Sequence, residues 1–531
     1  MVTMTDNDVV PEAAASRRLV ITAASLGTIF EWYDFYIYGA LAVFFGALFF
    51  PPGNDTAAFL ASLATFGAGF AVRPLGALVF GRLGDMVGRK YTFLVTILIM
   101  GLSTAAVGLL PTYAEVGLLA PVLLVGLRLL QGLAIGGEYG GAAIYVAEHA
   151  PDHLRGRHTS WIQTTSTVGL LLSLGVILVC RQTMDAASFA AWGWRIPFIL
   201  SVALLGISVY IRLRLEESPV FAAMKRTGAV SRAPFRDSFG NWTNLSRILV
   251  ALFGATAGQA VVWYTGQFYA LYFLTATLKL DYVNAYLLIA LALVAGTPLY
   301  ILFGALSDRI GRKPLIVGGF LLAALTYFPL FHALTAAVNP ALDTAQRNSP
   351  VTVAAHDCNV NVFAKPVTSC DLARDFLSKA GVTYVSIPTT DPAGVVVRIG
   401  VAEIRGYDAT AYAAALAAAG YPKATDPSQI RWVPATLLLT VMMVWATMVY
   451  GPMAAFLVEL FPARIRYTSL SLPFHVGNGL FGGFLPFVAF AVVVVTGDPY
   501  AGLWYPVGVA VVSFVVGLLF IRDRTGCRVA D

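Results

Sequence analysis

The sequence has 531 residues, of which 58% are apolar and only 12% are charged. A soluble chain of this length needs roughly twice that charged share to cover its surface, so the composition excludes an ordinary soluble globular protein. The net charge of +6 does not indicate nucleic-acid binding, because the basic residues are spread over the loops between apolar blocks.

Long apolar blocks without any charge, such as residues 91–114, 159–180 and 248–278, recur along the chain. Each exceeds the roughly 20 helical residues that cross a hydrocarbon core, so the sequence predicts an all-α polytopic membrane protein. We expect twelve transmembrane helices, in chain order at 19–46, 57–82, 91–110, 116–142, 159–180, 194–213, 247–275, 283–306, 314–333, 433–457, 468–494 and 500–521.

The basic residues of the predicted loops fall mostly on one side of the membrane. The short loops of the other side hold only Arg181, Arg195 and Lys279. Because Lys and Arg gather on the cytoplasmic side, we expect both termini there, in a cytoplasmic (inner) membrane. The expected layout is an N-terminal segment (1–18), an N-terminal six-helix half (19–213), a cytoplasmic central loop (214–246), helices seven to nine (247–333), an extracytoplasmic insertion (334–432), helices ten to twelve (433–521) and a cytoplasmic tail (522–531).

An internal repeat relates the two halves. The ten residues from Gly81 to Lys90 recur from Gly304 to Lys313 with six identities, and each copy follows the second helix of a six-helix set. A looser repeat pairs Glu148-x-x-Pro with Glu459-x-x-Pro. Such repeats are typical of transporters, whose substrate site lies between the halves near the membrane centre.

The second repeat is spaced more widely than the first, which indicates an insertion into the second half. Its sequence contains a helix-like stretch (371–380) and two strand-like stretches (382–387 and 395–404), so a small α+β unit is expected. Cys358 and Cys370 lie within it, on the side of the membrane where a disulfide persists. The two cysteines could equally stay reduced, and the sequence leaves both possibilities open.

Ionisable residues at membrane depth are costly and are therefore functional candidates. For proton coupling the candidates are Glu31, Asp34 and Arg128, with Asp34 and Arg128 expected at similar depth so that the arginine can act as partner of the carboxylate. The alternative is that these charges only neutralise one another and hold helices together. The substrate-binding candidates of the first half are Arg73, Arg128, Tyr33 and Gln131.

The predicted helices of the second half offer polar and aromatic side chains instead of charges. Gln259, Trp263 and Gln267 follow i, i+4 and i+8, which places them on one helical face that could line a substrate cavity. His475 could titrate near neutral pH. The alternatives are that the aromatic residues only pack and that His475 is a hydrogen-bonded histidine of the core.

These motifs resemble the metabolite:H+ symporter family of the major facilitator superfamily. The resemblance rests on the Gly-x-x-x-Asp-x-x-Gly-Arg-Lys loop and its second copy, on Phe30-Glu-Trp-Tyr-Asp-Phe, on Arg73-Pro-Leu-Gly and on Arg128-Leu-Leu-Gln-Gly. It covers nearly the whole chain except the insertion. It implies a conformational latch formed by Gly81, Asp85, Gly88, Arg89 and Lys90, with Asp308 and Arg312 in the second copy. Ser307 replaces the glycine of the first copy, which leaves the second latch open to question.

The resemblance further implies symport of a small organic anion, such as a mono- or dicarboxylate, with a proton. Symport of a zwitterionic osmolyte and a transporter-like nutrient sensor are the alternatives. The expected partners are the anion, the proton and membrane lipid, with no nucleic acid, and the expected functional unit is a monomer. We expect no enzymatic activity, no cofactor and no metal.

Overall fold

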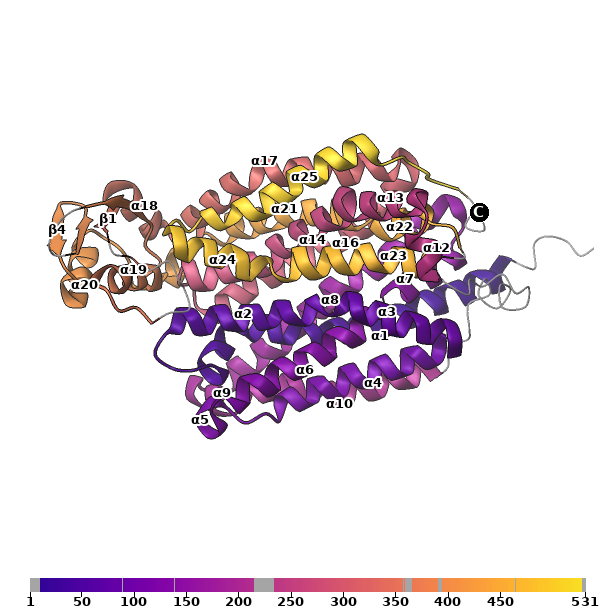
Figure 1. The fold of residues 1–531 in the computed structure, drawn as a ribbon, viewed down its shortest axis with the longest axis horizontal. Coiled ribbons are helices and arrows are strands. Elements are labelled where there is room, and N and C mark those ends of the chain that lie inside the picture. The colour runs from indigo at the N-terminus through magenta and orange to yellow at the C-terminus, as the bar shows by residue number, and fades with distance from the viewer. Residues whose placement is uncertain are drawn as a thin grey trace, which may run out of the picture.

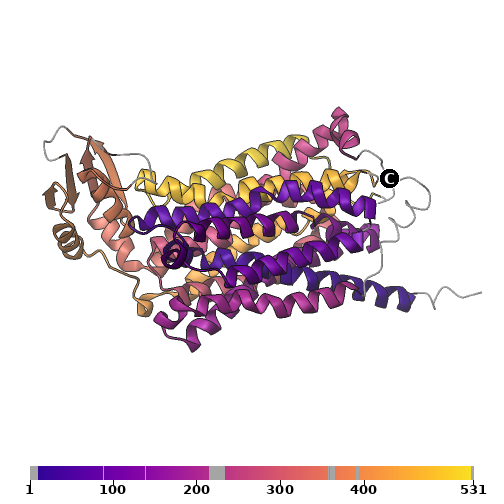
Figure 2. The same ribbon diagram turned by 60° about the horizontal axis from the view of Figure 1, so that its bottom comes forward.

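The computed structural model of the chain describes residues 10–87, 89–137, 139–213, 234–356, 358, 365–389, 394–463 and 465–527. Two bundles of long helices lie lengthwise against each other, the N-terminal one in indigo to purple and the C-terminal one in pink to yellow (Figures 1 and 2). A small α/β unit lies at one end of the bundle, and the last described residues lie at the opposite end. These ends are called the insertion end and the termini end below.

The N-terminal half is built from six spans, two of which are each made of two helices. Its long helices are α1 (Val10–Phe49), α2 (Asp55–Ala71), α3 (Arg73–Val87), α4 (Arg89–Gly108), α6 (Leu119–Gly136), α7 (Tyr139–His149), α8 (Arg155–Thr183) and α10 (Ile196–Leu213). The short helices α5 (Tyr113–Val116) and α9 (Ala186–Ala191) connect spans at the insertion end. The second span therefore breaks at Val72, directly before Arg73.

The C-terminal half follows the short helix α12 (Pro234–Phe239). Its helices are α13 (Trp242–Ala251), α14 (Ala257–Tyr264), α15 (Ala270–Tyr272), α16 (Tyr282–Ile310), α17 (Arg312–Val338), α21 (Trp432–Tyr450), α22 (Met453–Leu460), α23 (Arg466–Val476), α24 (Leu485–Thr496) and α25 (Trp504–Phe520). The π-helical turns η3 (Leu252–Thr256), η4 (Thr265–Tyr269), η5 (Phe273–Thr277) and η7 (Gly477–Gly483) interrupt the first and fifth spans of this half. Such turns often mark functional sites in helices.

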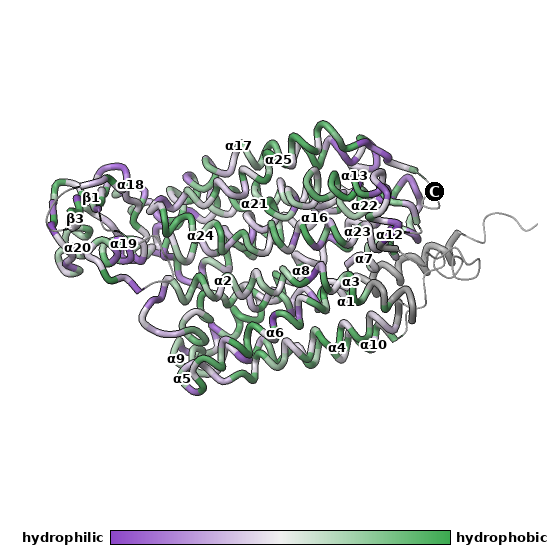
Figure 3. Tube along the Cα trace, viewed as in Figure 1, coloured by the Kyte–Doolittle hydropathy of each residue, from purple (hydrophilic) through white to green (hydrophobic). Residues whose placement is uncertain are grey.

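Eleven helical stretches of the described residues are long and apolar enough to cross a membrane, and the shorter apolar stretch Leu94–Gly108 completes the third span. The apolar colouring runs along both bundles, whereas hydrophilic residues gather in the insertion and at the termini end (Figure 3). The predicted fold class, an all-α membrane protein of twelve helices with a small α+β insertion, is confirmed.

The insertion contains a four-stranded sheet in the order β2-β1-β3-β4. Its elements are α18 (Pro340–Asn348), β1 (Val351–Ala355), α19 (Ser369–Lys379), β2 (Tyr384–Pro388), β3 (Val395–Ile399), β4 (Ala402–Arg405) and α20 (Ala409–Ala418). The prediction of one strand over 395–404 was wrong, because the chain turns at Gly400 (φ +57°) and the two pieces pair antiparallel.

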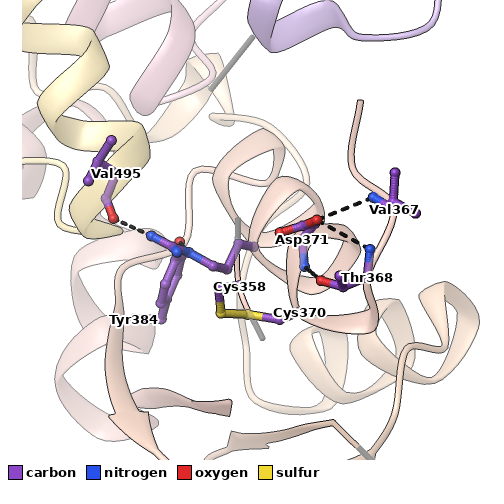
Figure 4. Close-up of a disulfide and its surroundings, with 8 residues drawn as sticks. Cys358, Val367, Thr368, Cys370, Asp371, Tyr384 and Val495 are labelled. Carbon is purple, nitrogen blue, oxygen red and sulfur yellow. Dashed lines mark hydrogen bonds between the residues drawn. A yellow bond between two sulfur atoms is a disulfide. The ribbon is translucent and has the colours of Figure 1, made fainter. Parts of the chain in front are cut away.

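The two cysteines of the insertion form a disulfide. Cys358 and Cys370 are bonded, which ties the chain after β1 to the first turn of α19 (Figure 4). Asp371 accepts hydrogen bonds from the backbone of Val367 and Thr368 and so fixes the start of the same helix. Of the two possibilities that the sequence left open, the structure shows the bridged one.

Glycines bring α2 and α3 against α6 with backbone contact. A Cβ atom at Gly132 would lie 1.6 Å from the carbonyl oxygen of Gly69, and one at Gly136 would lie 2.1 Å from that of Arg73. Only glycine fits there, and small residues four positions apart are the usual means of close helix contact in membranes. This contact sets the positions of Arg73 at the start of α3 and of Arg128 on α6.

Candidate functional site

Arg73 is a fully buried cation without a hydrogen bond. Its side chain is 0% exposed, and its three guanidinium nitrogens have no partner in the described structure. The guanidinium carbon lies 5.5 Å from the ring centre of Trp32 and 5.2 Å from that of Phe70. Aromatic faces attract a guanidinium, but they offset only part of the cost of burying its charge.

Aromatic residues of both halves surround this arginine. Four tyrosines lie within electrostatic range of its guanidinium: Tyr36, Tyr139, Tyr264 and Tyr450. Together with Arg73, Trp32 and Phe70 they are called the Arg73 cluster. The cluster draws on α1, α2, α3, α7, α14 and α21, so it spans the interface between the halves. Sequence reasoning found Arg73 but missed these tyrosines, because aromatic residues are common in membrane helices and nothing in their spacing singled them out.

The cluster continues into the C-terminal half through stacked rings. Tyr36 stacks on Trp263 with ring centres 5.4 Å apart, and Tyr139 stacks on Phe474 at 3.5 Å. The indole Nε1 of Trp263 donates to the hydroxyl of Tyr300 (2.9 Å). The predicted candidates Arg73 and Trp263 therefore come together through Tyr36.

Arg128 lies apart from Asp34. Its Nη1 donates to the side-chain oxygen of Gln131 (2.5 Å) and to the carbonyl oxygen of Phe35 (3.4 Å), and its guanidinium lies over the rings of Phe35 (4.2 Å) and Tyr38 (4.6 Å). No ion pair with Asp34 is formed in the described structure. The prediction that Arg128 acts as the partner of this carboxylate was wrong, because neighbouring residues of a helix point about 100° apart and Arg128 faces the Phe35 side.

Asp34 is buried on the side of α1 that faces α10. It is 5% exposed, and its Oδ1 has no hydrogen bond within the described chain. The hydroxyl of its neighbour Tyr33 donates to the carbonyl oxygen of Pro197 on α10 (2.8 Å), so Tyr33 is tied to the backbone and turned away from the Arg73 cluster. Glu31 is also buried, at 5% exposed.

The three glutamine candidates differ in how many hydrogen bonds their side-chain amides make. Gln259 and Asn478 exchange hydrogen bonds (3.1 and 3.5 Å), which join α14 to η7. Gln131 donates to Thr104 (2.9 Å). In contrast, both polar atoms of the Gln267 side chain lack a partner among the described residues. The amide of Gln267 thus makes no hydrogen bond of good geometry, although it lies near the hydroxyl of Tyr300, whereas the amides of Gln259 and Gln131 are hydrogen-bonded.

His475 is not a hydrogen-bonded core histidine. It is 0% exposed, and neither ring nitrogen has a hydrogen bond in the described regions. It follows Pro473 in α23, next to the π-helical turn η7, and lies within electrostatic range of Arg73. The interpretation of His475 as a hydrogen-bonded residue of the core is therefore not supported by its geometry.

The second latch copy forms an ion-pair network between the halves at the termini end. Asp308 accepts from the backbone nitrogens of Gly156 and Arg157 (2.8 Å each), at the first turn of α8. Arg312 binds Asp308 (2.7 Å) and Glu459 (3.0 Å), and Glu459 also binds Arg155 (2.8 Å). A carboxylate is stabilised at a helix N-terminus, so Asp308 joins the end of α16 to the start of α8.

Ser307 strengthens the second copy. Its hydroxyl accepts a hydrogen bond from Arg312 (2.6 Å). The side chains of the first copy, Gly81, Asp85, Gly88, Arg89 and Lys90, lie outside the described residues. A further cross-half pair, Glu148–Arg466 (3.7 Å), mirrors the Arg155–Glu459 pair. In the sequence, the repeat that relates Glu148-x-x-Pro to Glu459-x-x-Pro had already marked the glutamates of these two pairs.

Known proteins with similar sequences are membrane transporters. The family described as sugar (and other) transporter matches residues 19–241. A proline/betaine transporter of Salmonella typhimurium is 37% identical over 320 residues, which are 59% of this chain and 64% of that protein, so the match spans less than two thirds of it. The alpha-ketoglutarate permease of Escherichia coli is 35% identical over 341 residues, covering 64% of this chain and 77% of the permease.

A solved structure has the same fold. The xylose transporter XylE of E. coli, in a partially occluded inward-open conformation, superposes with a TM-score of 0.62 over 97% of this chain and 100% of that chain. The sequence identity is 17%, so this likeness speaks for the fold alone.

Proposed function

We propose, since this chain belongs to the metabolite:H+ symporter family of the major facilitator superfamily, that it transports a small organic anion together with a proton by alternating access. The anion is a mono- or dicarboxylate. The protein lies in a bacterial inner membrane as a monomer, with both termini in the cytoplasm and the insertion outside. Lipid surrounds the bundle.

The observation that carries this proposal is the uncompensated charge of Arg73. An isolated buried ion costs several kcal/mol, and a partner of opposite charge recovers part of that cost. A carboxylate fits best, because a guanidinium binds its two oxygens in a planar, bidentate arrangement. His475, whose ring nitrogens have no hydrogen bond in the described structure, and Gln267 beside Tyr300 supply further polar groups for the remainder of such a ligand.

Asp34 is the proposed proton carrier. A buried carboxyl group without an ion pair exchanges its proton when a conformational change brings it toward water. Replacing Asp34 with Asn should abolish proton-driven accumulation and spare exchange of substrate across the membrane. Full accumulation by the Asn variant would remove Asp34 from the mechanism, and the proton would then have to bind elsewhere.

A zwitterionic osmolyte is the second candidate substrate. Two observations favour it: the relative from Salmonella is a proline/betaine transporter, and aromatic rings surround Arg73. Aromatic rings bind quaternary ammonium groups, while Arg73 would bind the carboxylate of the same molecule. The two candidates thus share Arg73 and differ in what the rings contact.

The test is uptake into proteoliposomes under an imposed pH gradient. Radiolabelled 2-oxoglutarate, proline and glycine betaine are offered separately to the purified protein. We expect accumulation of 2-oxoglutarate that collapses when a protonophore is added. Uptake of betaine or proline alone would replace the anion with a zwitterion, and uptake of none of these or of a wider panel of carboxylates would favour a sensor.

A further inference from the structure

A cavity of about 410 Å³ lies at the insertion end, where three parts of the chain meet. Thr56 and Phe59 of α2 line it from the N-terminal half, Thr277 and Phe490 line it from the C-terminal half, and Lys379 lines it from the insertion. Its volume is in the range of cavities that hold small organic ligands. The Arg73 cluster contributes none of its lining residues.

The two lysines that line this cavity differ in their partners. Lys379 binds Asp375 (3.0 Å) and Asp55 (3.4 Å), and these carboxylates hold the pKa of Lys379 above its usual value against the opposing effect of burial. Lys279 also lines the cavity, and its ammonium has neither an ion pair nor a hydrogen bond in the described structure. Burial lowers the pKa of Lys279 to about 8. Lys279 is therefore the cation of this lining that has no ion pair among the described residues, although the two lysines and the carboxylates of Asp55 and Asp375 together carry no net charge.

The backbone holds Lys279 in an unusual conformation. Among the described residues it alone is a non-glycine with a left-handed backbone (φ +58°). The insertion fixes this turn, because Thr425 donates its backbone N–H to the carbonyl oxygen of Lys279 (3.2 Å) and its hydroxyl to that of Leu278 (2.5 Å). Strained residues of this kind persist where the surrounding structure enforces them, often at functional sites.

A glycine of the insertion completes the arrangement. A Cβ atom at Gly381 would lie 2.4 Å from the carbonyl oxygen of Thr277 and 3.4 Å from Cε of Lys279. Only glycine allows the insertion to approach this closely, since Gly381 also has a left-handed backbone (φ +72°). The insertion thus forms one wall of the cavity directly beside the lysine side chain.

We infer that this cavity is a second anion-binding site, in which Lys279 binds the carboxylate of the transported organic anion before it reaches the Arg73 cluster. The inference rests on the proposed function, because the ligand is the same anion. A single cation beside a mostly apolar wall suits a capture site: it raises the local concentration of the anion and releases it easily. The insertion is then part of the substrate path.

Transport kinetics give the first test. With 2-oxoglutarate as probe, K279Q should raise KM roughly tenfold, the loss of one charge-assisted contact, and leave kcat within about twofold. K279R keeps the charge and should restore a KM near that of the wild type. K423Q is the matched control, because Lys423 lines a neighbouring cavity of the insertion and not this one; its KM should stay within about twofold. Equal KM values for K279Q and K423Q would overturn the inference.

Chemical protection gives a second test that does not depend on transport. A membrane-impermeant acetylating reagent is applied from the side of the insertion, and the modified lysines are identified by peptide mass spectrometry. Millimolar 2-oxoglutarate should slow acetylation of Lys279 several-fold and leave Lys423 unaffected, also in an R73Q background. If wild-type protein transports 2-oxoglutarate but Lys279 is not protected, the inference fails while the proposed function stands. If Lys279 is protected but no anion is transported, the proposed function fails and the site remains.

Discussion

The two ends of the bundle are closed by different interactions. At the termini end, buried ion pairs join the halves: Arg155 and Arg312 share Glu459, and Asp308 caps α8. Toward the insertion end, tyrosine hydroxyls reach across the interface to backbone carbonyls, as Tyr272 does to Gly39 (2.7 Å). Breaking a buried ion pair leaves unpaired charges, whereas a freed hydroxyl can bind water. Separating the two halves at the termini end should therefore cost more free energy than separating them at the insertion end.

Removing the shared carboxylate should have the largest effect. E459Q leaves Arg155 and Arg312, which are 0% and 1% exposed, without their common partner. We expect the closed arrangement of the termini end to lose about 3–5 kcal/mol. Spin labels on α8 and α16 at that end should report a longer distance, and uptake should fall more than about tenfold.

The matched control is Asp152, which also binds Arg155 but whose side chain is 43% exposed. D152N should change the spin-label distance little, because an exposed pair contributes at most about 1 kcal/mol. If D152N and E459Q opened this end equally, burial would not be what makes the network strong.

The disulfide should contribute less, and only at the insertion end. Replacing Cys358 and Cys370 with serine frees a loop that spans 12 positions, which we expect to cost the insertion about 2–3 kcal/mol. The unfolding temperature of the insertion, followed by proteolysis, should fall. The distance at the termini end should not change; a change there would contradict the separation of the two ends.

The pH dependence of Lys279 is a smaller effect with a defined direction. Burial lowers the pKa of Lys279 to about 8, and a bound carboxylate favours its charged form. Its contribution is therefore present below pH 8 and lost as the pH rises through that value. The proton gradient acts equally on wild type and K279Q, so the ratio of their KM values isolates the lysine. Of the other groups that line the cavity, Lys379 stays charged.

We expect this KM ratio to fall from about ten near pH 6.5 toward one above pH 9. A ratio that stays constant across this range would show that Lys279 does not act through its charge.

The smallest effect is expected for the ion pair between the insertion and the N-terminal half. Asp55 is 87% exposed in its contact with Lys379, so D55N should weaken closure of the insertion end by less than about 1 kcal/mol. Labelling of a cysteine placed in the cavity, at Thr56, should speed up less than about fivefold. If D55N opened the insertion end as much as E459Q opens the termini end, the insertion end would not be the more weakly closed of the two.

The transmembrane spans and the residues that pair across the halves could be predicted from the sequence, because they depend on segment length and on the internal repeat. The direction in which each side chain faces could be predicted less well, because it depends on how each helix is rotated about its axis. Uncharged blocks specified the spans, because a helix must cover the hydrocarbon core, and the repeats around Glu148 and Glu459 marked the residues that pair across the halves. Spacing on α1 did not reveal that Arg128 faces Phe35 and not Asp34, because the rotation of a helix about its axis is set by packing. The tyrosines around Arg73 come from four separate helices, and no local pattern brings them together.

The most direct measurement is the affinity of purified protein for 2-oxoglutarate with and without the Arg73 guanidinium. R73Q should weaken binding at least about a hundredfold, R73K should retain part of the affinity, and both should keep the melting temperature of the wild type or exceed it. R181Q is the control, because Arg181 also lies over aromatic rings, those of Phe44 and Phe189, but outside the Arg73 cluster; it should bind like the wild type. Unchanged binding in R73Q would contradict the claim that the Arg73 guanidinium binds the carboxylate of the transported anion.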